Sequence, residues 1–281
     1  MPATLLFIGS FFIIESPRWL FFQGKKEEAL MALQKSRSKE EAEYDLNMMT
    51  KLVANKESAT AKTGRTSIWQ KHYLLPFTIA FAVACLTQLT GINVFLQLCT
   101  LILHHSGLHS SVISMLGSVG IGIMNFIVTI IAMMLVDKLG RKPLVILGTS
   151  GLVIALFYLG IVAKFLSPGN IQGYLMIAGF ILFIIFYAIG PGVVVWLAIS
   201  ELMPTAIRGK GMAICLFANC LTSTILAAVF LQLVNFIGYA GVFWICGGFT
   251  LIYLLIAIFL LPETKNKSLE EIEAFFKAKV A

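Results

Sequence analysis

The chain has 281 residues, of which 58% are hydrophobic and 12% charged, with a mean hydropathy of +0.89 and a formal net charge of +7. That composition excludes a soluble globular domain. The basic residues lie between long apolar runs, where they indicate membrane topology, and we therefore predict no nucleic-acid partner.

The first apolar stretch is short and covers residues 3–14. A bilayer crossing takes roughly 20 residues, and the stretch lacks the basic leading region of a signal peptide. We expect residues 1–14 to be the end of a truncated spanning helix. Residues 15–71 are rich in charge, with Leu30 and Leu33 among apolar residues at helical spacing. This pattern predicts cytoplasmic amphipathic helices and a linker.

Residues 72–261 contain the membrane-spanning part of the chain. Six apolar runs are long enough to cross a bilayer, and no carboxylate lies in the middle of any of them. The runs are 72–103, 111–136, 143–166, 171–200, 211–236 and 239–261. The sequence therefore predicts an all-α membrane protein with a bundle of six transmembrane helices.

Lysine and arginine are distributed unevenly between the predicted spans. Six crossings would place 20 of the 21 on one side, with Lys164 as the exception. The positive-inside rule assigns that side, and the C-terminus with it, to the cytoplasm. Within residues 262–281, Ser268 and Glu271 form a capping-box pattern beside an apolar stripe that includes Phe276. We expect a cytoplasmic C-terminal helix there.

The stretch "ACLTQLTGIN" places polar side chains near the middle of the first span. An unpaired amide in hydrocarbon costs several kcal/mol, so Gln88 and Asn93 must meet other helices, water or a ligand. On an unbroken helix their side chains lie roughly 140° apart. For both to reach one ligand, the helix has to be irregular at Gly91. A second helix break is predicted at the run Gly190, Pro191 and Gly192.

Two cytoplasmic loops, "VDKLGRKPL" and "SELMPTAIRGKG", carry charges of both signs. Their sequence spacing suggests that Asp137 pairs with Arg141, and that Glu201 pairs with Arg208. Because two similar loops lie three crossings apart, we expect the six helices to consist of two structurally related groups of three, as in many transporters.

Five motifs together resemble the sugar porter family of the major facilitator superfamily, which includes facilitative glucose transporters and bacterial sugar–proton symporters. They are "ESPRWL" (15–20), "QLTGIN" (88–93), "DKLGRKPL" (137–144), "GPGVVVWLAISELMPTAIRGKGMA" (190–213) and "LPETKNKSLEEIE" (261–273). The family has twelve spanning helices. The resemblance implies that residues 1–14 end the sixth helix and residues 72–261 form helices seven to twelve. The chain then looks like a C-terminal half whose N-terminal six-helix half is missing.

The resemblance also implies roles for individual residues. Gln88 and Asn93 correspond to family positions that bind sugar hydroxyls, and we expect Thr90 and Gln97 to assist them. Further sugar-binding positions correspond to Asn125, Trp196 and Asn219. Hydrogen bonding between helices is an equal alternative for the two asparagines, as packing is for the tryptophan. A cytoplasmic charge network that locks one conformation corresponds to Glu15, Arg18, Asp137, Arg141, Lys142, Glu201 and Arg208.

We expect a transporter and not an enzyme, because no catalytic constellation occurs at membrane depth. The expected substrate is a monosaccharide, carried by alternating access across the cell (inner) membrane. Uniport and proton symport both stay open, and no cofactor or metal is predicted. The alternatives are a transport-incompetent fragment of a split or frameshifted gene, or a membrane-bound subunit that binds or senses sugar. A few amide hydrogen bonds of roughly 1 kcal/mol each, with an aromatic face, predict affinity near a millimolar.

Overall fold

The computed structural model describes two stretches of the chain. The first is residues 15–50, without residues 16, 36–37, 45 and 48–49, and the second is residues 71–276, without residues 107–110, 205–206, 266, 268–270 and 273–274. Two compact units, Met1–Thr66 and Ser67–Ala281, contain these stretches, and each is described by itself.

The first unit contains two short helices, α2 (Pro17–Phe22) and α3 (Lys26–Gln34). Gly24 lies between them with a φ of +83°, a conformation that L side chains rarely adopt. The two helices bury a small apolar cluster against each other. Its buried members are Leu20, Phe21, Ala29 and Ala32.

A capping box marks the next helical segment of the first unit. The backbone N–H of Ser38 donates to Glu41 Oε2 at 3.2 Å, and the backbone N–H of Glu41 donates to Ser38 Oγ at 3.3 Å. The two side chains therefore satisfy two backbone donors that the helix itself leaves without partners.

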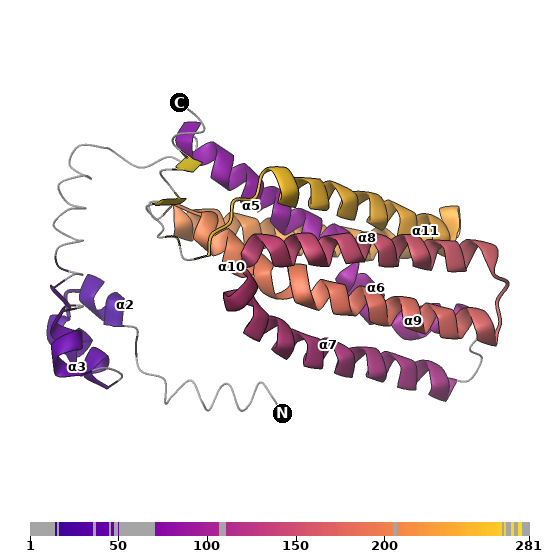
Figure 1. Cartoon of the computed structure of the whole chain (residues 1–281), viewed down its shortest axis with the longest axis horizontal. Helices are drawn as coiled ribbons and strands as arrows, with labels where there is room; N and C mark the ends of the chain where they lie inside the picture. Colours follow the sequence, from indigo (N-terminus) through magenta and orange to yellow (C-terminus); the bar gives the residue numbers. More distant parts are fainter. Residues whose placement is uncertain are drawn as a thin grey trace. The chain divides into compact units, whose positions relative to one another are not determined.

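The second unit is a bundle of apolar helices (Figure 1). Its elements are α5 (Lys71–Leu89), α6 (Ile92–His105), α7 (Ser111–Leu139), α8 (Arg141–Phe165), α9 (Asn170–Tyr187), the π-helical turn η1 (Ala188–Gly192), α10 (Val193–Leu202) and α11 (Arg208–Phe259). No strand occurs in the described stretches. The described bundle has 5 helical stretches that are long and apolar enough to cross a membrane, and one of them consists of α5 and α6.

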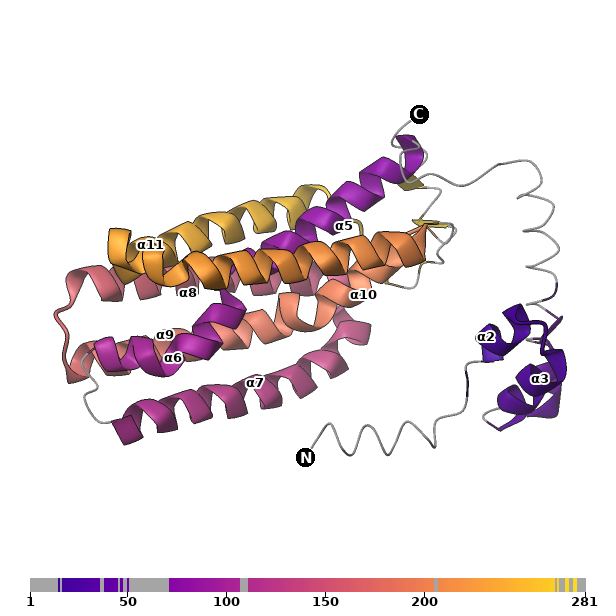
Figure 2. The same ribbon diagram turned by 180° about the vertical axis from the view of Figure 1, so that it is seen from behind.

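The last stretch, α11, crosses twice. Its 52 residues would extend roughly 78 Å at 1.5 Å per residue, far beyond the roughly 30 Å hydrocarbon core. Gly238, with φ 74° and ψ 169°, interrupts the helix. The two halves of α11 run antiparallel on either side of this turn (Figure 2). The described bundle therefore makes six crossings, and the predicted all-α fold with six spans is confirmed.

A break separates α5 from α6 at Gly91, whose φ is +87°. The backbone N–H of Gly91 donates to the Gln88 carbonyl at 2.9 Å, and the Thr90 N–H donates to the Leu86 carbonyl at 3.2 Å. A Cβ atom on Gly91 would collide with the ring of Phe95. The backbone conformation and the ring contact therefore both require glycine at this position.

The turn η1 crosses α8 at very short range. A Cβ atom on Gly148 of α8 would lie 2.6 Å from the Cα atom of Gly190 and 2.7 Å from the carbonyl oxygen of Phe186. Pro191 follows within η1 and cannot donate a backbone hydrogen bond. The π-helical turn, in which Gly192 is the last residue, therefore packs directly on the α8 backbone.

Aromatic rings fill the core near the start of α6. The ring of Phe95 lies between 5.1 and 6.2 Å, centroid to centroid, from four other phenylalanine rings. They are Phe180, Phe183, Phe230 and Phe243. The C-terminal residues Ile272 and Phe276 are also buried, in the other large cluster of the bundle. Ser268 of the expected capping box lies outside the described residues.

Candidate functional site

Three side-chain amides meet at the break between α5 and α6. Asn93 Nδ2 donates to Gln88 Oε1 at 2.8 Å, and Gln88 Nε2 donates to Asn219 Oδ1 at 3.1 Å. Asn219 Nδ2 donates in turn to the Ala84 carbonyl at 2.8 Å. One chain of hydrogen bonds thus joins α5, α6 and the first half of α11.

The helix break explains how Gln88 and Asn93 come into contact. On a continuous helix these side chains would point roughly 140° apart. The left-handed conformation of Gly91 redirects α6, so that the two amides lie at hydrogen-bond distance. The irregularity expected from the spacing of the two amides is therefore present in the structure.

The amide network keeps part of its hydrogen-bonding capacity. Asn93 is exposed, and its second N–H donates to Ser223 Oγ at 3.0 Å. Asn93 Oδ1, the second N–H of Gln88 and the Ser223 hydroxyl proton have no partner assigned in the described residues. Two donors and one acceptor of the network are therefore not used by contacts within the described residues.

Ser223 is a site residue that the sequence prediction missed. It contacts Asn93 across 130 positions of the chain. Its one sequence signal is that it follows Asn219 by four residues, which places both on the same face of α11.

Three other predicted sugar-binding residues lie on the expected helices but outside this network. Gln97 follows Asn93 by one turn of α6 and is exposed. Asn125 is half-buried on α7, and Trp196 is 37% exposed on α10. In the described part of the chain, no hydrogen bond links them to Gln88, Asn93 or Asn219.

The expectation for Thr90 was wrong. Its side chain is fully buried, and its hydroxyl donates to the Thr87 carbonyl at 2.7 Å. Thr90 precedes the break and continues the last turn of α5 into the bundle, where its hydroxyl satisfies a carbonyl at the end of α5 that the helix leaves free. It is not available to a ligand.

Arg141 is the centre of the charged loops. Its guanidinium lies 3.1 Å from Glu201 Oε1 and 3.4 Å from Asp137 Oδ1. The Arg141 and Glu201 side chains are only 15% and 20% exposed, whereas that of Asp137 is 79% exposed. The partly buried pair with Glu201 is therefore the stronger interaction.

The predicted pairing of Glu201 with Arg208 is wrong. Arg208 Nε and Nη2 donate to the Met203 carbonyl at 3.3 and 3.2 Å, and the described ion-pair partner of Glu201 is Arg141. Arg208 caps the turn after α10, whose last carbonyl groups have no partner within that helix.

Glu263 joins the same region, and the sequence prediction gave it no role. Its carboxylate accepts hydrogen bonds from the backbone N–H groups of Arg141 and Lys142, both at 3.1 Å. A carboxylate is favourable at the start of α8 because helix N-termini expose N–H groups with partial positive charge. Lys142 Nζ donates to the Ile258 carbonyl at 2.8 Å, so the loop is linked both to the end of α11 and to the segment that follows it.

Glu15 and Arg18 belong to the first unit, and their link to the charged loops stays a prediction. Glu15 is exposed, and the Arg18 side chain lies outside the described residues.

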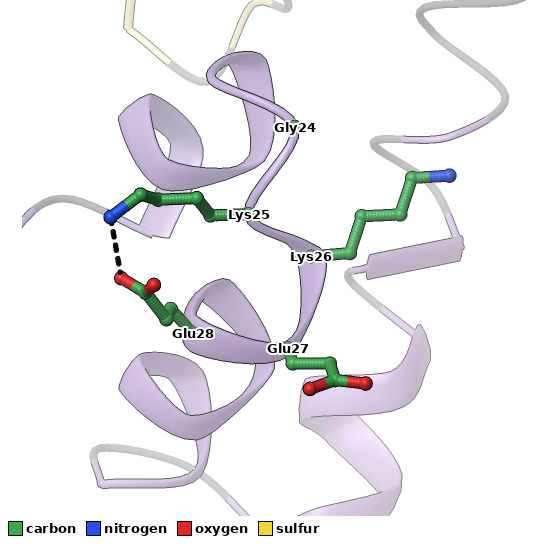
Figure 3. A pocket seen from close by; sticks show the side chains of 5 residues that line it. All are labelled: Gly24, Lys25, Lys26, Glu27 and Glu28. Carbon is green, nitrogen blue, oxygen red and sulfur yellow. Dashed lines mark hydrogen bonds and ion pairs between the residues drawn. The ribbon is translucent and has the colours of Figure 1, made fainter.

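The first unit also has an open hollow of about 370 Å³, lined by residues 24–28 (Figure 3). Lys25 Nζ and Glu28 Oε2 form an exposed ion pair of 3.2 Å there. An exposed pair of this kind contributes only about 0–1 kcal/mol to stability.

Comparison with known proteins identifies the class. The profile of the family described as "Sugar (and other) transporter" matches residues 1–276. A probable metabolite transport protein, CsbC of Bacillus subtilis, is 34% identical over 99% of this chain and 59% of its own length. The facilitated trehalose transporter Tret1 of Aedes aegypti is 31% identical over 97% of this chain and 34% of its own length.

Solved structures show the same fold. The proton:xylose symporter XylE, bound to 6-bromo-6-deoxy-D-glucose, matches with a TM-score of 0.79 and 30% identity over 98% of this chain and 57% of that one. The protein belongs to the sugar transporter family of the major facilitator superfamily, and its bundle is half of that fold. It is a multi-pass integral membrane protein whose relatives are transporters, not enzymes. The chain spans a little over half the length of CsbC and XylE.

Proposed function

We propose that this chain carries one wall of a monosaccharide path and works in transport by alternating access. The observation that supports this most directly is the hydrogen-bonded contact of Gln88, Asn93 and Asn219 at a helix break. Amides that both donate and accept suit the neutral hydroxyl groups of a sugar. Discontinuous helices are typical of transporter binding sites.

The exposure of Asn93 adds to the argument. An exposed amide near the middle of a spanning segment cannot face hydrocarbon without a cost of several kcal/mol. It has to face a polar path or another protein segment. In our proposal the opposite wall is the N-terminal six-helix half that the family resemblance implies. Gln97, Asn125 and Trp196 are proposed to line the same path.

The orientation of the protein is part of the proposal. The charged loops, with Asp137, Lys142 and Glu201, lie at the cytoplasmic end, and the C-terminus lies on the same side of the cell (inner) membrane. The described spans hold no mid-membrane carboxylate of this chain. A proton-coupling group would then belong to the N-terminal half, and the proposal is compatible with uniport and with symport.

Uptake of labelled sugar by cells that lack their own sugar carriers tests the proposal. The chain is expressed alone and joined to an N-terminal six-helix half, with glucose, xylose and trehalose as probes. We expect monosaccharide uptake by the joined protein and a loss of at least tenfold in Gln88→Ala, because truncation leaves Asn219 Oδ1 and one N–H of Asn93 without a partner.

Thr78→Ala is the matched control for this experiment. Thr78 is on the same helix, is exposed, and bonds only to its own helix at the Leu75 carbonyl. Sugar uptake by the Thr78→Ala protein should equal that of the unmodified protein. A protein that reaches the membrane but takes up no sugar in any form would instead support a fragment or a sensing subunit. Uptake of trehalose alone would overturn the monosaccharide assignment.

A further inference from the structure

Tyr253 is fully buried in the second half of α11, although it carries a hydroxyl group. Its partner is the Thr87 hydroxyl on α5, at an oxygen–oxygen distance of 3.4 Å. Thr87 Oγ1 also lies 2.8 Å from the Val83 carbonyl, which can only accept. Thr87 Oγ1 is the donor in both contacts, so its one proton is shared between the Val83 carbonyl and the Tyr253 phenol oxygen.

The Tyr253 contact falls on the turn of α5 that carries the proposed site. Thr87 directly precedes Gln88 in the last turn before the break. On the same turn, Asn219 from the first half of α11 bonds the Gln88 side chain and the Ala84 carbonyl. The two halves of α11 therefore hold one turn of α5 at two separate points.

We infer that Tyr253 is a positioning residue for the proposed sugar site and acts through Thr87. By fixing the last turn of α5, it sets the direction in which the Gln88 amide meets a sugar hydroxyl. The inference rests on the proposed function, since it concerns the same site.

The energetics favour positioning over stability as the role of this pair. Phenylalanine would fill the same space and would need no hydrogen-bond partner. A distance of 3.4 Å makes a weak O–H···O bond. Replacing both members of a buried hydrogen bond by apolar groups of the same shape is nearly neutral or stabilising. Removal of the two hydroxyls together should therefore leave the stability of the bundle intact and change the placement of Gln88.

The test uses the joined protein of the uptake assay with three variants, Tyr253→Phe, Thr87→Val and the double substitution. Each single variant should raise KM roughly fivefold, the effect of one weak hydrogen bond on an equilibrium, with Vmax within about twofold of the unmodified protein. The double variant should be no worse than either single one, because all three break the same bond. Its melting temperature without sugar should equal or exceed that of the unmodified protein.

Two controls separate positioning from general packing. Thr250 is fully buried on the same half of α11, and its hydroxyl donates to the Cys246 carbonyl of its own helix at 2.7 Å. Thr250→Val should leave KM unchanged. Thr87→Ser keeps the hydroxyl and should restore a KM close to that of the unmodified protein.

The outcomes distinguish the inference from the proposed function. If Tyr253→Phe shows the KM of the Thr250→Val control, the inference is wrong. Effects of Tyr253→Phe and Thr87→Val that add fully in the double variant also overturn it. Failure of the proposed function has another signature: the unmodified joined protein takes up no sugar, and sugar does not raise its melting temperature. In that case the inference falls with it.

Discussion

At the scale of single residues, Gly91 combines two restrictions on a side chain at its position. Its φ of +87° lies in the left-handed region, and the Phe95 ring occupies the place where a Cβ atom would be. A non-glycine residue in the left-handed region costs about 1–2 kcal/mol even without a steric conflict. The break in the helix, and with it the contact between Gln88 and Asn93, therefore depends on this glycine.

The first residue-scale prediction concerns Gly91→Ala. We expect it to lower the free energy of unfolding by about 2–3 kcal/mol, because left-handed strain and the Phe95 conflict add. Thermal unfolding in detergent, followed by circular dichroism, measures the change. Gly120→Ala is the control, since Gly120 lies in α7 and has no atom within 4 Å of its Cβ position. It should be neutral or slightly stabilising. Equal melting temperatures for the two variants would contradict the prediction.

At this scale the sequence correctly predicted the helix break, because Gln88 and Asn93 could reach one ligand only if the helix between them was irregular. The spacing of Gln88 and Asn93 was sufficient to predict an irregular helix at Gly91. The same reasoning failed for Thr90, because an unbroken helix places it on the face of Asn93, whereas the real break after Thr90 turns Asn93 away from that face. A helix break changes the direction of each following side chain, and periodicity alone does not give that angle.

At the scale of helices, Arg141 links elements that are distant in the sequence. It connects the end of α7, through Asp137, to the end of α10, through Glu201. Its backbone N–H, at the start of α8, is capped by Glu263 from the segment after α11. The ends of four helices thus meet around one residue, and this residue joins the loop between α7 and α8 to the loop after α10.

The two carboxylates bound by the Arg141 guanidinium should differ strongly in their contribution to the stability of the bundle. Arg141→Ala leaves Glu201 without a partner at 20% exposure, and we expect a loss of about 3–5 kcal/mol in the free energy of unfolding. Asp137→Ala removes a carboxylate that is 79% exposed, and we expect a loss of at most about 1 kcal/mol. Chemical unfolding in detergent compares the two variants. A loss for Asp137→Ala as large as that for Arg141→Ala would show that exposure does not determine the strength of these pairs.

The wrong pairing of Glu201 with Arg208 shows a limit of sequence reasoning for helix ends. The two residues are close in sequence, but a turn separates them, and Arg208 satisfies the Met203 carbonyl within that turn. Contacts between distant elements were the ones missed. Glu263 reaches Arg141 across 122 positions, and Tyr253 reaches Thr87 across 166. Nothing in a single sequence relates such pairs, whereas hydropathy predicted all six spans because each span depends only on its own residues.

At the scale of the whole molecule, the apolar surface agrees with a bilayer environment. Within its candidate span, α7 has only 22% of the residues buried inside the bundle, compared with 61% for the stretch formed by α5 and α6. Exposed α7 side chains such as Phe126 and Met134 are apolar. They need lipid or another protein segment around them, because an apolar face of this size is unfavourable in water. The polar exposed residues Asn93 and Gln97 need a different neighbour, so the bundle has at least two distinct faces.

The orientation of the bundle in the membrane is the prediction for the molecule as a whole. Lys138 is exposed at the end of α7, and Ser167 is exposed between α8 and α9, so that one crossing, α8, separates them. The positive-inside rule places Lys138 in the cytoplasm and Ser167 outside. After replacement of the five native cysteines, single cysteines at these positions report their side through an impermeant maleimide applied to intact cells.

We expect Ser167→Cys to be labelled in intact cells and Lys138→Cys only after permeabilisation. Met134→Cys is the control for a lipid-facing position, since Met134 is 67% exposed within the apolar part of α7, and it should stay unlabelled in both conditions. The reverse pattern for Ser167 and Lys138 would place Arg141 and its carboxylates outside the cell. The amide site would then be separated from the cytoplasm by the aromatic cluster around Phe95 instead of by the charged loops. Which end of the proposed sugar path faces the cytoplasm therefore depends on this result.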